Sequence, residues 1–139
     1  MHIQSYLYFD GRCEEALAFY RRVLGAQIVT MMRFKDSTVP PDPAMCPPGA
    51  DIGDKVMHVS FRIGDTDLMA SDGRCGGRPS FQGFSLAITA ADVAEADRLF
   101  EALGEGGRVQ MPMEQTFFAA RFGMVEDRFG VSWMVLAAP

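Results

Sequence analysis

The sequence predicts an α+β protein in which two βαβββ modules form a curved mixed sheet with a concave pocket. Three observations lead to this fold. The 139 residues are enough for one core, so a second module has to share the core of the first. The same order of strand, helix and strands occurs twice, and each helix has one apolar face that a sheet would cover. We expect a single domain, with modules at about 1–72 and 83–139 and a glycine-rich linker at about 73–82.

The first half predicts one helix among four strands. We expect the helix at 13–24, closed by Gly25, and the strands at 3–9, 27–34, 56–63 and 67–71. The helix is apolar on one face, at positions 13, 16, 17, 20, 23 and 24, with acids at its start and arginines toward its end. In strand 56–63, one face carries Val56, His58, Ser60 and Arg62, and the other is apolar. The polar face is therefore the place to look for chemistry.

The second half repeats this order. Asp92 and Gly104 bound a helix at 92–103, and strands are expected at 84–89, 108–111, 119–126 and 131–137. Similarity between the halves at the residue level is faint, so the repeat rests on the order of elements. One such module cannot bury its sheet face by itself, and pairing two of them gives a concave side.

Residues 36–54 contain five prolines and two glycines, which prevent a helix or a central strand. A loop of this length in a compact domain is often a lid or a binding loop. An insertion without a role is the alternative.

Composition argues against several function classes. The chain has 18 acidic and 13 basic residues, a net charge of −5, and the basic residues are scattered. This pattern argues against nucleic-acid binding. No apolar stretch reaches the roughly 18 residues that span a bilayer, and we see no secretion signal. We therefore expect a cytoplasmic protein that binds neither nucleic acid nor membrane.

The three cysteines, Cys13, Cys46 and Cys75, form no C-x-x-C pair. Neither a disulfide framework nor a zinc knuckle is indicated, and reduced thiols are expected. Cys13 begins a helix, where the helix dipole would lower a thiol pKa, but a packed, inert cysteine is the preferred interpretation.

Four short motifs are the most specific feature. Residues 114–123 have the pattern E-x-T-F-F-A-x-x-F-G, and 127–134 have D-x-F-G-V-x-W-M. F-x-G-x-C-x-x-A begins at Phe9, and M-x-S-D begins at Met69. Together they resemble the PhnB-like branch of the glyoxalase, bleomycin-resistance and dioxygenase superfamily, also called vicinal oxygen chelate (VOC) proteins. The resemblance covers essentially the whole chain and implies paired βαβββ modules.

Members of this branch often carry the description 3-demethylubiquinone-9 3-methyltransferase. A methyltransferase that uses S-adenosylmethionine usually has a glycine-rich turn after a parallel strand. Here the glycine-rich stretch 104–107 follows a predicted helix, which argues against methyl transfer.

The resemblance also implies where a metal would bind in metal-using members of the superfamily. Those positions fall at Gln4 or Ser5, Met69, Ser85 and Met134. Thioethers and hydroxyls are poor ligands for hard or borderline divalent ions, so no metal and no other cofactor is expected. A different metal site that uses His58 and Glu114 is the alternative.

His58 and Glu114 are the candidate catalytic residues. His58 lies on the polar strand face beside Arg62 and could act as an acid or a base near neutral pH. The alternative is a histidine held by hydrogen bonds under a loop. Glu114 lies among aromatic residues, where burial would raise its pKa. It could instead form a salt bridge with Arg121 or be an exposed loop carboxylate.

The candidate ligand-binding residues include aromatic side chains together with polar ones and a methionine. Aromatic side chains could stack on a planar ligand, although aromatic residues at strand spacing are more often core. The full set is Tyr6, Tyr8, Arg62, Met69, Asp72, Thr116, Phe118 and Trp133.

We expect a protein that binds a small organic molecule in the concave face, either as an enzyme without the inherited metal or as a non-catalytic, resistance-type binder. A metal-dependent lyase or dioxygenase with non-standard ligands is a further alternative. The resemblance also implies a homodimer, because superfamily members commonly assemble from modules through sheet edges that are otherwise exposed.

Overall fold

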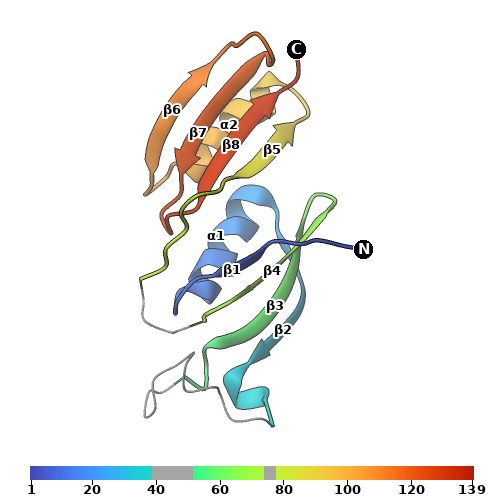
Figure 1. Ribbon diagram of the computed structural model, residues 1–139, viewed down its shortest axis with the longest axis vertical. Helices are drawn as coiled ribbons and strands as arrows, with labels where there is room; N and C mark the ends of the chain where they lie inside the picture. Colours follow the sequence, from blue (N-terminus) through green and yellow to red (C-terminus); the bar gives the residue numbers. More distant parts are fainter. Residues whose placement is uncertain (39–51, 74–77) are drawn as a thin grey trace. The chain divides into compact units, whose positions relative to one another are not determined.

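The structure is a computed structural model that describes residues 1–38, 52–73 and 78–139 (Figure 1). The chain divides into two compact units, Met1–Pro79 and Ser80–Pro139. Cys46, Cys75, most of the predicted 36–54 loop and part of the predicted linker lie outside the described residues.

The first unit is a four-stranded sheet with one helix. Its elements are β1 (Tyr6–Tyr8), α1 (Cys13–Leu24), β2 (Gln27–Arg33), the 3-10 helix η1 (Phe34–Asp36), β3 (Val56–Ile63) and β4 (Thr66–Ser71). The strand order is β1-β4-β3-β2. Only β1 and β4 run parallel among these pairs, and the other two pairs are antiparallel.

The second unit repeats this arrangement. Its elements are β5 (Leu86–Ala90), α2 (Val93–Leu103), β6 (Arg108–Glu114), β7 (Arg121–Glu126) and β8 (Ser132–Ala137). The strand order β5-β8-β7-β6 has its parallel pair, β5 and β8, at the equivalent place. The predicted α+β fold with two βαβββ modules is confirmed.

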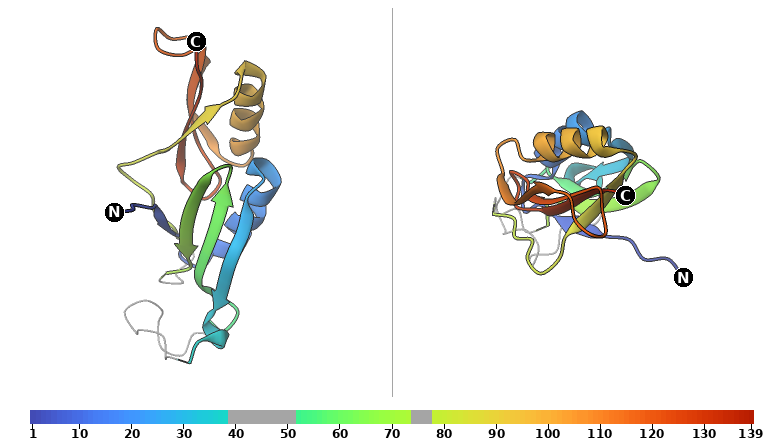
Figure 2. Two further views of the ribbon diagram at one scale, coloured as in Figure 1. Left: turned by 90° about the vertical axis from the view of Figure 1, so that its right-hand side faces the viewer. Right: turned by 90° about the horizontal axis from the view of Figure 1, so that it is seen from above.

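Each helix covers one face of the sheet in its own unit (Figure 2). Helix α1 packs against β3, and α2 packs against β5, β7 and β8. The helix side of the first sheet is buried and apolar, with Leu7, Val59, Phe61 and Ala70 at 5% exposure or less. Neither α1 nor α2 covers the opposite side of its own sheet, and that side carries most of the candidate residues.

The helix boundaries follow from their capping residues. Gly25 adopts a left-handed conformation (φ 67°) after α1, as a residue without Cβ does easily. Asp92 caps α2, since its Oδ1 accepts a hydrogen bond from Glu95 N at 2.8 Å. In α1, Phe19 is buried while Leu24 is only half-buried, which differs from the predicted apolar face. Neither helix of the described chain is long and apolar enough to cross a membrane.

Strands β1 and β6 differ most in length from their predictions, and the other strands differ by at most two residues. Strand β1 spans only Tyr6–Tyr8, because it is an edge strand that pairs with β4 alone. Strand β6 extends to Glu114, three residues beyond its predicted end, because it pairs with β7 through two irregularities in register. Pro112 is tolerated there since β6 is an edge strand. Glu114 therefore lies on a strand and not in a loop.

Candidate functional site

Most candidate residues of the first unit lie together on one face of its sheet. Residues opposite each other in neighbouring strands point to the same side, and Tyr6 pairs with Met69, which pairs with Ser60. These positions alternate with the buried residues of the helix side. We call the side away from α1 the first open face, formed by Tyr6, Tyr8, His58, Ser60, Arg62, Asp67, Met69 and Ser71.

A chain of polar contacts crosses the first open face. The hydroxyl of Tyr6 lies 2.9 Å from Nδ1 of His58, although the two residues are 52 positions apart in sequence. Nε2 of His58 lies 3.3 Å from the hydroxyl of Ser60. The ring of Tyr6 also contacts the ring of Tyr8, with centroids 4.9 Å apart. The sequence predicted His58, Tyr6 and Tyr8 separately, and the structure brings them into contact.

The hydroxyl of Tyr6 keeps its proton on this face. Burial raises the pKa of Tyr6, and a hydrogen bond from Ser71 offsets part of the increase. Tyr6 is therefore protonated at neutral pH, and its hydroxyl shares a hydrogen bond with Nδ1 of His58 whose direction depends on the imidazole tautomer. Nε2 of His58 and the Ser60 hydroxyl share the second hydrogen bond, whose direction depends on the same tautomer. The contact with Ser60 is the longer of the two, so Nε2 is the nitrogen that a ligand would more easily take over.

Arg62 lies on the same open face but is paired with a neighbour. Its Nε donates to Asp67 Oδ1 at 2.7 Å, and its Nη2 contacts Oδ2 at 3.4 Å. Both side chains are substantially exposed, so the pair adds little to stability. Arg62 therefore has an ionic partner on this face, while Tyr6 and His58 are partly buried and hydrogen-bonded to each other.

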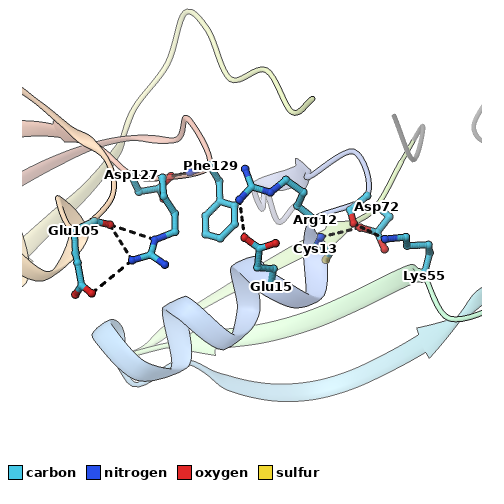
Figure 3. A network of polar contacts seen from close by, with 10 residues as sticks. Arg12, Cys13, Glu15, Lys55, Asp72, Glu105, Asp127 and Phe129 are labelled. Carbon is cyan, nitrogen blue, oxygen red and sulfur yellow. Dashed lines mark hydrogen bonds and ion pairs between the residues drawn. The ribbon is translucent and has the colours of Figure 1, made fainter. Parts of the chain in front are cut away.

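Asp72, another predicted ligand-binding residue, lies inside the first unit at 1% exposure. Its Oδ1 accepts from Cys13 N at 2.7 Å and its Oδ2 accepts from Val56 N at 2.5 Å (Figure 3). The side chain of Arg12, the residue before α1, does not cap the helix. The carboxylate of Asp72, which follows β4, accepts the hydrogen bond from the first helical N–H instead. Both carboxylate oxygens of Asp72 therefore accept hydrogen bonds from backbone N–H groups.

The second open face is the side of the second sheet away from α2. Phe122 pairs with Glu114 and with Leu136, and Met124 pairs with Met111 and with Met134. Glu114 is exposed, and its side chain makes no hydrogen bond or ion pair with any described residue. Arg121, proposed as its alternative partner, pairs with Asp97 at 3.0 Å instead. The expected burial of Glu114 is thus not observed, and the exposed alternative holds.

Thr116 and Phe118 belong to the turn between β6 and β7. The hydroxyl of Thr116 accepts from Phe118 N at 3.3 Å and from Ala119 N at 3.1 Å, which fixes the turn. The Phe118 ring is 47% exposed and lies edge-on to Phe122, with centroids 5.2 Å apart. Thr116 therefore positions an aromatic ring beside the second open face.

Trp133 lies on the helix side of the second sheet and not on the open face. It pairs with Leu86 and Val125, is buried, and donates from Nε1 to Asp127 Oδ2 at 2.8 Å. The structure thus separates Trp133 from the other predicted aromatic contacts.

The second open face also carries a row of polar contacts, which the sequence did not predict. Ser85 donates to Ser132 at 2.9 Å, Ser132 donates to Gln110, and Gln110 donates to Glu126, which pairs with Arg108. No local sequence pattern indicates this row, because it depends on register across three strands.

Comparison with known proteins places this fold in a family. A family model described as 3-demethylubiquinone-9 3-methyltransferase matches residues 1–136. The chain belongs to this family, the PhnB-like branch of the VOC superfamily. Protein YjdN of Escherichia coli is 36% identical over 97% of the chain and 94% of its own length.

Solved structures agree with this assignment. Protein PA1353 of Pseudomonas aeruginosa is 43% identical, with a TM-score of 0.84 over 99% of this chain and 98% of that one. A Bacillus cereus protein described as a putative 3-demethylubiquinone-9 3-methyltransferase, PhnB protein, is 28% identical, with a TM-score of 0.79 over 99% and 100%. A Frankia glyoxylase/bleomycin resistance protein/dioxygenase domain, 14% identical over 99% and 95%, shares the fold with a TM-score of 0.64.

The positions that hold a metal in metal-using VOC proteins do not suit a divalent ion in this PhnB-like chain. Met69 and Met134 lie on the open faces as thioethers, and Ser85 is hydrogen-bonded to Ser132. Within residues 1–38, 52–73 and 78–139, no three His, Cys, Asp or Glu side chains gather around a metal position. The expectation that no metal or other cofactor binds stays a prediction. The predicted homodimer and cytoplasmic location stay predictions.

Proposed function

We propose that this PhnB-like protein binds a small organic molecule on the first open face, and that His58 exchanges a proton with it. The contact that carries the proposal is the hydrogen bond between Tyr6 and His58 on a sheet face that its own helix does not cover. A histidine whose second nitrogen is fixed by a partner is oriented for acid or base chemistry.

The lengths of the two hydrogen bonds, 2.9 Å to Tyr6 and 3.3 Å to Ser60, support a specific role for each nitrogen of His58. Tyr6 holds Nδ1 of His58, so Nε2 is the atom that would give a proton to the ligand or take one from it. The thioether of Met69 and the ring of Tyr8, which is 52% exposed, supply apolar surface beside it. Such a surface suits a molecule with a flat apolar part and one proton-exchanging oxygen or nitrogen.

Sequestration without turnover is a second candidate function. The adjoining, tilted rings of Tyr6 and Tyr8 favour it, because two neighbouring aromatic rings can bind a planar molecule without any chemistry. In that case His58 acts only as a hydrogen-bonding group.

Methyl transfer is not part of the proposal, despite the description of the family. The glycine-rich stretch 104–107 lies between α2 and β6 and does not follow a parallel strand. Among the described residues, the strands that precede an α-helix are β1 and β5. In each sheet, this strand and the strand that follows the helix lie at opposite edges. That connection differs from the parallel crossover of a nucleotide-binding fold.

The test is a screen of planar phenols and aromatic carbonyl compounds, followed by imidazole proton resonances in NMR. The chain has two histidines, so His2→Gln is a matched control for His58→Gln. We expect a bound compound to shift the His58 signal and leave the His2 signal in place. Loss of binding or turnover in His58→Gln and Tyr6→Phe, but not in His2→Gln, supports the site.

The same compound separates the two candidate functions. Turnover that disappears in His58→Gln while binding remains supports an enzyme, and binding without turnover in the native protein supports sequestration. Glu114→Gln tests the second candidate catalytic residue, and unchanged turnover removes Glu114 as a base. Binding that is insensitive to both His58→Gln and Tyr6→Phe would overturn the proposal.

A further inference from the structure

Three methionines form a continuous row on the second open face. Met124 in β7 pairs with Met111 in β6 on one side and with Met134 in β8 on the other. Paired residues in antiparallel strands have Cα atoms about 4.5–5.5 Å apart and side chains on the same side. The three thioethers, which we call the methionine row, therefore rise side by side from three adjacent strands.

The composition of the row is unusual for a sheet. Strand positions favour β-branched and aromatic residues, and the helix side of the same strands follows that rule, with Val109 opposite Val125. Met111 is 46% exposed, and Met124 and Met134 are half-buried. Packing of the core therefore does not account for three unbranched thioethers in line on the less covered side.

A bulge in β6 completes the row. Val109 pairs with Val125, and the next paired residues are Met111 and Met124, so Gln110 is the extra residue on β6. Without this extra residue, regular pairing would place Gln110 opposite Met124 and turn Met111 toward α2. The bulge thus exchanges an amide for a third thioether beside Met124.

Side-chain hydrogen bonds hold the bulged residue in place. Gln110 Oε1 accepts from the Ser132 hydroxyl at 2.9 Å, and Gln110 Nε2 lies 3.4 Å from Glu126 Oε2. These contacts anchor Gln110 to β7 and β8, and so they fix the position of Met111 relative to Met124 and Met134. The row is thereby preorganised across three strands.

We propose that the methionine row binds one soft monovalent cation, Cu(I) or Ag(I), through its three thioether sulfurs. Thioethers are soft, neutral ligands that select Cu(I) over the hard and borderline divalent ions. Long, unbranched side chains on adjacent strands can turn their sulfurs toward one point above Met124. The same residue type that argues against the divalent metal of the superfamily thus favours a different ion.

The test is a titration followed by the ε-methyl signals of ¹³C-labelled methionine. Cys46→Ser and Cys75→Ser remove thiols that would compete for the ion, while the buried Cys13 stays. Silver nitrate, and an acetonitrile complex of Cu(I) without oxygen, are added to this variant. We expect the signals of Met111, Met124 and Met134 to shift together and to saturate at one ion per chain.

Matched variants locate the ion. Met124→Leu retains the apolar volume but removes the central sulfur, and it should weaken binding by at least about tenfold, since loss of even an outer contact costs that much. Met113→Leu, a methionine whose sulfur faces Gly123 and the helix side, should bind as before. Met111→Leu repeats the test at a half-exposed position where folding is least at risk.

Two results would overturn the proposal. One is that the methionine ε-methyl signals show no saturable shift at equimolar ion, or that the size of each shift follows only the exposure of that methionine. The other is equal affinity in Met124→Leu, Met111→Leu and Met113→Leu. Neither result bears on the Tyr6 and His58 site, which is read from imidazole signals in the other unit.

Discussion

The indole nitrogen of Trp133 donates a hydrogen bond to the carboxylate of Asp127 over 2.8 Å. The other oxygen of Asp127 accepts from the backbone nitrogens of Phe129 and Val131, at 2.9 and 3.1 Å (Figure 3). One buried carboxylate thus fixes the turn between β7 and β8 and orients a side chain of β8. Since Trp133 is the one tryptophan in the sequence, its fluorescence reports on this arrangement.

Replacing Asp127 with Ala should destabilise the second unit by about 4 kcal/mol, because buried N–H groups lose a charged acceptor. Asp127→Asn should destabilise less, as one oxygen remains. Denaturant unfolding followed by Trp133 fluorescence measures the change. Glu101→Ala, at an exposed position of α2, is the control and should stay within about 0.5 kcal/mol of the native protein. Equal stability of Asp127→Ala and the control would contradict the role of Asp127.

Asp72→Ala should destabilise the first unit by about 3–5 kcal/mol, since Cys13 N and Val56 N both lose their acceptor in a buried place. Circular dichroism during urea unfolding measures it, with the exposed Asp65→Ala as control. Hydrogen exchange at the Cys13 and Val56 amides should accelerate in Asp72→Ala alone. Unchanged protection of both amides would show that other groups hold the start of α1.

Stability should fall at alkaline pH through Cys13 and Tyr6. Burial, followed by repulsion from Asp72 and Glu14, raises the pKa of Cys13 well above its ordinary 9.0. Burial also raises the pKa of Tyr6 above 10.0. The unfolded chain releases these protons from about pH 9 upward while the folded chain keeps them, so their contribution is complete below pH 9 and is lost as pH rises.

The measurement is the urea midpoint between pH 8 and pH 10.5. Cys13→Ala should flatten the decline that begins near pH 9, and Tyr6→Phe should flatten the part above pH 10. In a protein with Cys46→Ser and Cys75→Ser, Cys13 should react with a thiol reagent at pH 8 only after unfolding. Fast labelling of Cys13 in the folded protein would refute its assignment as a packed, inert cysteine.

Gly107→Ala should severely destabilise the second unit. A Cβ at Gly107 would lie 2.1 Å from the carbonyl oxygen of Glu126 and 2.9 Å from backbone atoms of Asp127, so the backbone itself would have to move. Gly104→Ala is the control, because its φ of −75° is ordinary and its nearest neighbour is a Val125 side-chain atom at 3.3 Å. Thermal unfolding compares the two. A similar melting temperature for both variants would contradict the close approach at Gly107.

The sequence predicted well those features that depend on neighbouring residues. The α1 and α2 helices follow from apolar spacing, from Asp92 and from the glycines at their ends. Strand β3 was predicted with its observed limits, because the alternation of His58 and Ser60 with buried residues is a local pattern. The repeated order of elements, and the motifs that resemble PhnB-like proteins, were sufficient for the family and for the two modules.

The extent of β1 and β6 and the surroundings of the candidate residues were not available from local pattern. Edge position shortens β1, and pairing with β7 lengthens β6, both of which depend on distant segments. As residue types, Trp133 and Asp72 suit a ligand site. In the structure, Trp133 instead donates a hydrogen bond to Asp127, and Asp72 accepts hydrogen bonds from backbone amides, because register and burial place them there. The alternation of residues along a strand does not by itself show which side of the sheet α2 covers.

The sequence by itself therefore determined the elements, their repeated order and the family, since periodicity, capping and motifs are properties of short segments. Only the tertiary structure decided which residues meet. Hydrogen bonding between strands brings Tyr6 to His58 across 52 residues, and one bulged residue, Gln110, places Met111 beside Met124. Both outcomes depend on register, and a shift of a single residue in register would reverse the side on which a side chain lies.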